Sequence, residues 1–355
     1  MKKLLLAILL FGLDALAMFL FKNHAGFFFP WYRNLSKNWI AFLASLTSSM
    51  KVAVWDIAAL CLAFLILFSL IRVIFKRKSF LRWLSSVVLL LSILAFMAVF
   101  SWMLNHYAPE LSEELSLDVR EYSFDELYET TKHYLNEASG YALLMKRDEE
   151  GHLVENDFYE MAEIAGASYE KLCEEYPVFE GTTVRVKKLS LIGEYLMYNG
   201  IIGMYMPITA ESGVPASVPG AVLGFTMAHE AGHRLGLAGE EEANFAAYLA
   251  CMSSEDPRMN YSGSYNAFSY CFSALYRIDP EKALALYESH DDEGARALKL
   301  DRKDTSETYR RYESPLKEVS DQINDTYLKT FSEENGIQSY GQVVDYLIAW
   351  HLKKD

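Results

Sequence analysis

Two histidines and a glutamate occur in the order H-E-x-x-H at His229, Glu230 and His233. Side chains four residues apart on a helix lie one turn apart on the same face, so both imidazoles can bind one metal ion. The glutamate between them can accept the proton of an attacking water molecule, as in zinc peptidases. The motif therefore predicts a Zn²⁺ site with His229 and His233 as ligands and Glu230 as the catalytic base.

A third protein ligand has to come from the residues that follow the motif. One common pattern would place a histidine at position 239, but this residue is Gly239, so an acidic ligand remains. We predict Glu240 as that ligand, with Asn244 one helical turn further on orienting one of the histidines. Glu242 is the competing candidate, although it lies about 200° around the helix from Glu240. The acidic run could also simply stabilise the start of a helix through the helix dipole.

The two helices that carry these residues are predicted over 222–235 and 240–252. The residues before the motif are apolar, which is typical of a buried helix. Gly236 is expected to end the first helix, and Gly239 to help the chain reverse tightly into the second. This arrangement would bring the start of the second helix close to the histidines.

A short strand over residues 203–206, ended by Pro207, is predicted before the motif helix. It could border the site and pair with an extended peptide, or it could be an ordinary core strand; the sequence leaves both interpretations open. Tyr205 and Tyr261 are candidates for donating a hydrogen bond to a developing oxyanion. The chain has 23 tyrosines, so neither is singled out by its type alone.

Three apolar runs, over about 4–21, 52–75 and 83–104, are each long enough to cross a bilayer as a helix. We predict a membrane region over 1–108 and one further domain over 109–355. The first run differs from a cleaved signal peptide because no small-residue cleavage site follows it. Two aspartates inside these runs, Asp14 and Asp56, are costly in lipid unless they have a function or lie near a helix end.

The basic residues predict which side of the membrane each part occupies. Lys2 and Lys3 precede the first run, and four basic residues between 76 and 82 separate the second and third. Short basic segments stay in the cytoplasm, which places residues 105–355 outside it. Lys and Arg residues in the first outer segment, 22–51, weaken this prediction, and an aromatic cluster in the same segment suits a membrane interface.

The part that follows the membrane region is acidic. Residues 1–110 contain 11 basic and 3 acidic side chains, and the remaining residues contain 22 and 44. An acidic domain disfavours nucleic acid, so the expected partners are the lipid bilayer and a peptide or protein substrate. Three cysteines in this part, without a C-x-x-C motif, indicate no disulfide framework; Cys251 and Cys271 could pair but more often such residues are small core residues.

The predicted fold is mostly helical (α+β), with a small β-sheet. Ser123 and Glu126 form a capping-box pattern at the start of one helix. Residues 210–220 are rich in Pro, Gly and Ser and are predicted to form a loop. Besides the two site helices, we expect helices over 122–138, 155–176, 261–276, 280–290, 314–330 and 340–352, and strands over 184–189 and 201–207.

Several of these stretches resemble one family of bacterial membrane proteins, domain-of-unknown-function family 3810. The resemblance rests on 205–211, 229–236, 240–245, 261–263 and 336–341. It implies a few N-terminal membrane helices followed by a zincin-like domain, and in wider metallopeptidase groups the first Glu of a similar E-x-x-A-N pattern, here Glu240, is the metal ligand. The usual T-G-E-A-N pattern is replaced here by residues 209–213, which leaves the role of Glu211 open.

Two functions remain open from the sequence. The first is a membrane-anchored, gluzincin-like zinc metallopeptidase that hydrolyses peptide bonds outside the cytoplasm. The second is a non-catalytic membrane sensor or assembly protein with a structural metal site. Glu230 favours the first, because a structural site has no use for a base beside its ligands.

Overall fold

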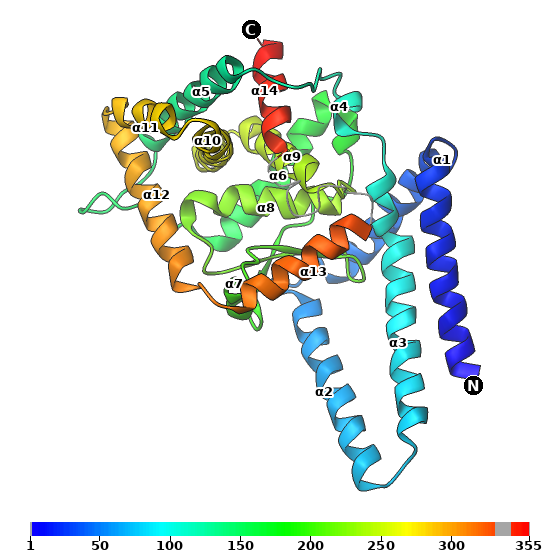
Figure 1. The fold of residues 1–355 in the computed structure, drawn as a ribbon. Helices are drawn as coiled ribbons and strands as arrows, with labels where there is room; N and C mark the ends of the chain where they lie inside the picture. The colour runs from blue at the N-terminus through cyan, green and yellow to red at the C-terminus, as the bar shows by residue number, and fades with distance from the viewer. Residues whose placement is uncertain (1, 331–341, 355) are drawn as a thin grey trace.

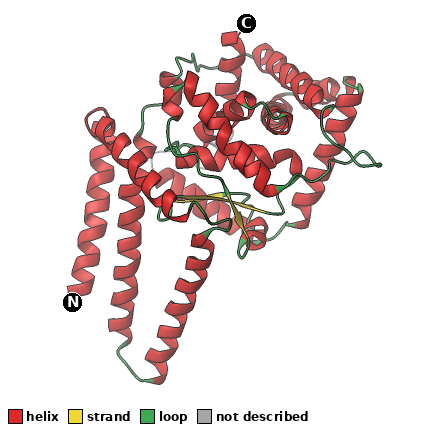
Figure 2. Ribbon diagram, turned by 180° about the vertical axis from the view of Figure 1, so that it is seen from behind, coloured by secondary structure: helices red, strands yellow, loops and turns green. Residues whose placement is uncertain are grey.

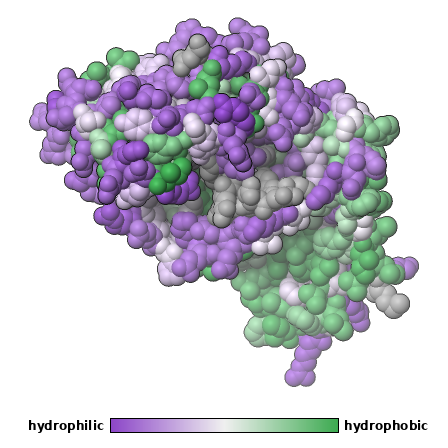
Figure 3. All heavy atoms as spheres, turned by 45° about the horizontal axis from the view of Figure 1, so that its top comes forward, coloured by the Kyte–Doolittle hydropathy of each residue, from purple (hydrophilic) through white to green (hydrophobic). Residues whose placement is uncertain are grey.

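The protein is described by a computed structural model over residues 2–330 and 342–354. A helical domain lies at one end, and three long helices project from it (Figure 1). Apolar side chains gather on these projecting helices, whereas the surface of the domain is largely hydrophilic (Figure 3). The three helices are long and apolar enough to span a membrane, so the chain has the form of a membrane-anchored protein.

The first helix is much longer than the sequence predicts. Helix α1 runs over Lys2–Thr47, with non-helical backbone angles at His24. The first outer segment, 22–51, is therefore largely helical, although no helix was predicted between residues 21 and 52. The physical reason lies in packing: Ile40 and Ala44 from the second half of α1 are buried against Trp102. Tertiary contacts thus stabilise the second half of this helix, which lies beyond the end of the apolar run and was therefore not predicted.

The other two membrane helices, α2 (Val54–Phe75) and α3 (Phe80–Ser101), match the predicted spans closely. A short 3-10 helix, η1 (Met103–Tyr107), leads from α3 into the domain. The N-terminus of the chain and the turn between α2 and α3 lie at the end of these helices furthest from the domain (Figure 1). Lys3 donates a hydrogen bond to Ser86 near the start of α3, which places both basic segments at that same end.

Two of the basic residues that weakened the orientation argument contact the domain. Arg33 forms an ion pair with Glu114 at 2.6 Å, and Lys37 donates to the carbonyl groups of Val178 and Glu180. They therefore bind acidic or carbonyl groups of the protein rather than lipid headgroups. This gives them a structural role that the sequence alone did not indicate.

A three-stranded sheet with the order β1-β3-β2 lies under the site helices (Figure 2). Strand β1 (Lys187–Leu189) is parallel to β3 (Glu211–Pro215), and β2 (Met204–Met206) is antiparallel to it. The predicted loop over 210–220 is wrong in its first half, since β3 is the central strand. The Ser, Gly and Pro residues of β3 are typical of a loop, which explains the wrong prediction. Gly213 is needed in the strand because a Cβ atom there would lie 2.5 Å from Leu189.

The core of the domain surrounds helix α8 (Gly220–Arg234), which is packed by α6 (Phe158–Glu175), α9 (Glu240–Ser253) and α10 (Pro257–Ile278). The capping box of Ser123 and Glu126 is confirmed at the start of α5. Cys251 and Cys271 are both buried and free, so they are core residues. The remaining helices are α4 (Leu111–Glu114), α5 (Phe124–Ala142), η2 (Pro177–Phe179), α7 (Gly193–Tyr198), α11 (Pro280–Ser289), α12 (Glu293–Arg311), α13 (Leu316–Thr330) and α14 (Val343–Lys354).

Helix α12 was not predicted from the sequence. It is strongly amphipathic, and its buried residues include Leu298 and Asp301. Asp301 forms an ion pair with Arg147 at 2.8 Å, which fixes α12 against the loop that follows α5. The family-like segment 336–341 lies outside the described residues.

Candidate metal centre

Helix α8 places both histidines of the motif on one face. His229 and His233 lie with their ring centroids 4.5 Å apart. The Nδ1 atom of His233 is 2.7 Å from the carbonyl oxygen of Leu237, so this nitrogen is the donor and Nε2 is the ring atom that could bind a metal ion once it has lost its proton. Gly236 has a φ of 96° and ends α8 in the left-handed conformation, as predicted.

The start of α9 brings a carboxylate to the histidine pair. The Oε2 atom of Glu240 lies 3.3 Å from Nε2 of His229 and 3.7 Å from Nε2 of His233. One ligand atom from each of these three residues lies within 4.8 Å of the other two, a group that could hold a metal ion. The reversal into α9 needs a left-handed residue only at Gly236, because Gly239 has an ordinary φ of −67°.

Glu242 has a different partner. Its Oε1 atom accepts a hydrogen bond from the backbone N–H of Leu111 at 2.6 Å, at the start of α4. The structure therefore brings Glu240, and not Glu242, to the two histidines. The 200° separation around α9 is the physical reason, since one helix face cannot present both side chains to one point.

Burial and charge set the protonation of this group. Burial raises the pKa of Glu230 to about 7, although the two histidines act against this shift. Burial lowers the pKa of His233, but the charge of Glu240 outweighs it and raises the value to about 9. Burial also raises the pKa of Glu240, and the histidines overcome it, so that this pKa lies well below its usual range. Glu240 is thus kept ionised, while Glu230 can exchange a proton near neutral pH.

Strand β2 borders Glu230. A Cβ atom at Gly203, immediately before β2, would lie 2.2 Å from Oε1 of Glu230, so only glycine fits there. On the central strand, Ser212 donates to the backbone carbonyl of Glu230 at 2.5 Å. Strand β2 pairs with β3 on one side, and no described strand pairs with its other side. It is thus an edge strand beside the site rather than a central core strand.

Neither tyrosine candidate forms a hydrogen bond with His229 or His233 among the described residues. Tyr205 is buried in an apolar cluster with Trp102, Ile40 and Ala44, and within the described chain its hydroxyl has no hydrogen-bond partner. Tyr261 donates its hydroxyl proton to Asp301, in the network that fixes α12.

Asn244 contacts a residue that the sequence did not single out. Its side-chain oxygen accepts a hydrogen bond from the hydroxyl of Tyr270 at 3.2 Å. Its Nδ2 atom and the Nδ1 atom of His229 are both buried without a hydrogen-bond partner among the described residues. The predicted contact of Asn244 with a histidine remains a prediction. Tyr270 lies close enough to Glu240 for that charge to add to the effect of burial in raising its pKa.

A residue at the end of a membrane helix also contacts the motif. Trp102, which follows α3, donates from its indole Nε1 to the backbone carbonyl of His233 at 2.6 Å. The two rings meet edge to face, with centroids 5.8 Å apart. An aromatic residue after an apolar run is typical of a membrane interface, so nothing in the sequence indicated that Trp102 contacts the H-E-x-x-H motif.

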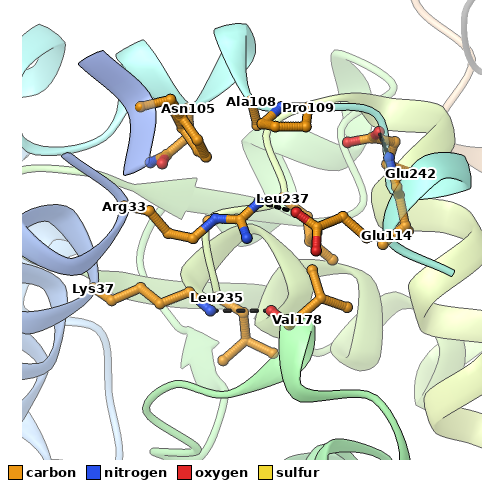
Figure 4. Close-up of a pocket in the computed structure, with 13 residues that line it drawn as sticks. Arg33, Lys37, Asn105, Ala108, Pro109, Glu114, Val178, Leu235, Leu237 and Glu242 are labelled. Carbon is orange, nitrogen blue, oxygen red and sulfur yellow. Dashed lines mark hydrogen bonds and ion pairs between the residues drawn. The ribbon is translucent and has the colours of Figure 1, made fainter. Parts of the chain in front are cut away.

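A small pocket lies behind the turn between α8 and α9 (Figure 4). Arg33 and Lys37 of α1 reach into it, and Glu242 lies on its far side. The ion pair of Arg33 with Glu114 crosses it. The pocket is therefore a junction between α1 and the domain, separate from the face of α8 that carries the histidines.

Comparison with known proteins supports the family and nothing beyond it. Residues 31–348 match the family described as "Protein of unknown function (DUF3810)", so the chain belongs to this family. No curated protein and no solved structure matches the chain.

Proposed function

We propose that this protein is a membrane-anchored zinc metallopeptidase with a zincin-like domain. The observation that carries this proposal is the convergence of His229, His233 and Glu240 on one point, beside the buried carboxylate of Glu230. The domain would act outside the cytoplasm, since its exit from the membrane lies opposite the basic ends of the three helices.

The residues present fit a zinc ion. Two imidazole nitrogens and one carboxylate oxygen form the His₂Glu set of many catalytic zinc sites. Oε2 of Glu240 is buried and has no good hydrogen-bond partner among the described residues, as expected of an atom reserved for a ligand. When bound there, zinc would polarise the scissile carbonyl group and make a water molecule more acidic.

The protein's own groups would carry the proton. Glu230 would accept a proton from the attacking water and donate it to the amine that leaves. In the metal-free site, burial raises the pKa of this carboxyl group, which favours the binding of a proton. The side of β2 that pairs with no described strand would bind an extended peptide by strand addition, next to Glu230.

The test uses the purified full-length protein in lipid nanodiscs. We expect close to one zinc per chain and cleavage of an unstructured protein such as casein, both removed by a chelator. The variant Glu230→Gln should keep the zinc and lose cleavage. Zinc binding without hydrolysis of casein or of a mixed peptide library would instead favour the non-catalytic sensor or assembly protein.

A further inference from the structure

The metal centre lies close to the predicted membrane boundary. The apolar part of α3 from Trp83 to Ser101 is about 28 Å long, which matches a hydrocarbon core of about 30 Å. Trp102 is the next residue, and its indole contacts the backbone of His233. A single tryptophan side chain therefore separates the membrane helix from the metal-binding motif.

Contacts of helix α2 with the domain indicate the same position for the membrane boundary. Asp56, in its first turn, accepts hydrogen bonds from the backbone N–H groups of Ser190, Leu191 and Ile192, at 2.8 to 3.1 Å. In return, the carboxylate of Glu211 accepts the N–H groups of residues 54 and 55 at the start of α2. These contacts attach the segment before α7 directly to the membrane helix.

The domain exposes apolar side chains at this level. Leu191, Tyr195 and Tyr198 of the α7 segment are exposed, with Tyr195 at 59%. Helix α13 and the residue that ends α12 both contact α7: Ser320 of α13 donates to Asn199, and Tyr312, directly after α12, donates to Glu194. We call the exposed residues of both segments the α7–α13 surface: Leu191, Tyr195, Tyr198, Leu316, Val319 and Ile323.

The α13 residues of this surface share one helix face. Leu316, Val319 and Ile323 have the spacing i, i+3 and i+7 and are exposed, with Ile323 at 67%. Both α7 and the start of α13 lie at the edge of the domain from which α2 leaves (Figures 1 and 2). An amphipathic helix at a membrane boundary binds with its apolar face in the interfacial region of the lipid.

We propose that the α7–α13 surface rests on the lipid bilayer and holds the metal centre at the membrane surface. The bilayer is its occupant because the surface is continuous with α2, which enters the membrane at Asp56. Resting on the proposed peptidase function, this placement defines the substrate class: polypeptides anchored in the same membrane, cut close to where they leave it. An extended chain covers about 3.3 Å per residue, so a cut within roughly the first ten residues lies no more than about 33 Å from the membrane.

The contact with lipid is tested with full-length protein in nanodiscs. Ile323→Cys and, as the control, Ile278→Cys at the exposed end of α10 are each labelled with an environment-sensitive dye, after replacing Cys61 and Cys173 by serine. Lipids with brominated chains should quench the label at 323 at least twofold more than the label at 278. Equal quenching would overturn the proposal. If the fluorescence of the label at 323 instead changes with the number of protein copies per nanodisc and not with bromination, the surface binds a second copy of the chain. This result would also overturn the proposal.

The substrate class is tested with a single-span protein that carries an unstructured stalk of mixed sequence, about 40 residues long. After reconstitution with the full-length protein, cut sites are mapped by mass spectrometry. We expect the cut sites to lie within roughly the first ten stalk residues. In the triple variant Leu316→Gln/Val319→Gln/Ile323→Gln, the cut sites should spread to stalk residues further from the membrane, while the zinc content stays unchanged. Cuts spread evenly along the stalk would overturn the inference but leave the peptidase function intact. Quenching at 323 without any cleavage would support the α7–α13 surface and count against the peptidase function.

Discussion

The indole Nε1 of Trp102 donates a hydrogen bond to the carbonyl oxygen of His233, so the residue at the end of a membrane helix contacts the H-E-x-x-H motif. This carbonyl belongs to the last turn of α8. The membrane region therefore supports the site directly, and we expect the domain to depend on it for a fully ordered metal centre.

Replacing Trp102 by Phe should keep most of the ring packing and remove the hydrogen bond. We expect a loss of about 1 kcal/mol in the free energy of unfolding and weaker zinc binding. The matched control is Trp83→Phe, which removes an indole hydrogen bond to Ser69 between α2 and α3. Zinc titration should show weaker binding only for Trp102→Phe, and an equal effect of both variants would contradict a role at the metal centre.

Substitutions of the two histidines should affect metal binding, whereas substitution of the glutamate between them should affect turnover alone. His229→Ala and His233→Ala should each lose the metal, because each removes one of three ligands. Glu230→Gln should keep the metal and lower turnover by about 10²- to 10⁴-fold, since it removes proton transfer alone. Elemental analysis and a peptide cleavage assay check this, and near-normal turnover in Glu230→Gln would refute the assigned base.

The acidic residues of α9 should behave differently from one another. Glu240→Ala should abolish tight zinc binding, because Glu240 faces both histidines. Asn244→Ala should weaken it by roughly 10- to 100-fold if its amide orients a histidine. Glu242→Ala should keep zinc affinity but lower stability, since the N–H of Leu111 loses its acceptor. Loss of zinc in Glu242→Ala with retention in Glu240→Ala would reverse the assignment.

A buried ion pair joins the sheet to the membrane helices. Lys187 and Glu211 lie 2.6 Å apart and are almost fully buried, and Lys187 also donates to the carbonyl of Thr47 at the end of α1. Lys187→Met leaves a buried carboxylate without its cation, so we expect destabilisation by about 3–5 kcal/mol. Lys171→Met, which breaks the exposed pair with Glu255, is the control and should change thermal stability little. Similar melting temperatures for both variants would show that the buried pair is not needed.

The orientation of the domain can be tested without any assay of activity. A reporter that is active only in the cytoplasm, fused after residue 355, should stay inactive, and protease added to intact cells should cut the domain. The reason is the cluster of basic residues at the opposite end of the membrane helices. An active reporter would place the domain in the cytoplasm.

The sequence by itself determined the features that depend on local pattern. Periodicity and spacing located the motif helix, the glycine that ends it and the capping box at Ser123, because these are set by residues a few positions apart. Apolar runs of sufficient length likewise located the three membrane helices.

Only the tertiary structure decided the features that depend on distant residues. Strand β3 has a loop-like composition but is buried between two partners, and the second half of α1 is stabilised by packing against Trp102. The sequence favoured Glu240 over Glu242, but how close the Glu240 carboxylate comes to the histidines depends on the direction in which α9 leaves the turn at Gly236. The contact of Trp102 with His233 joins residues 131 positions apart, and no local propensity encodes such a distance.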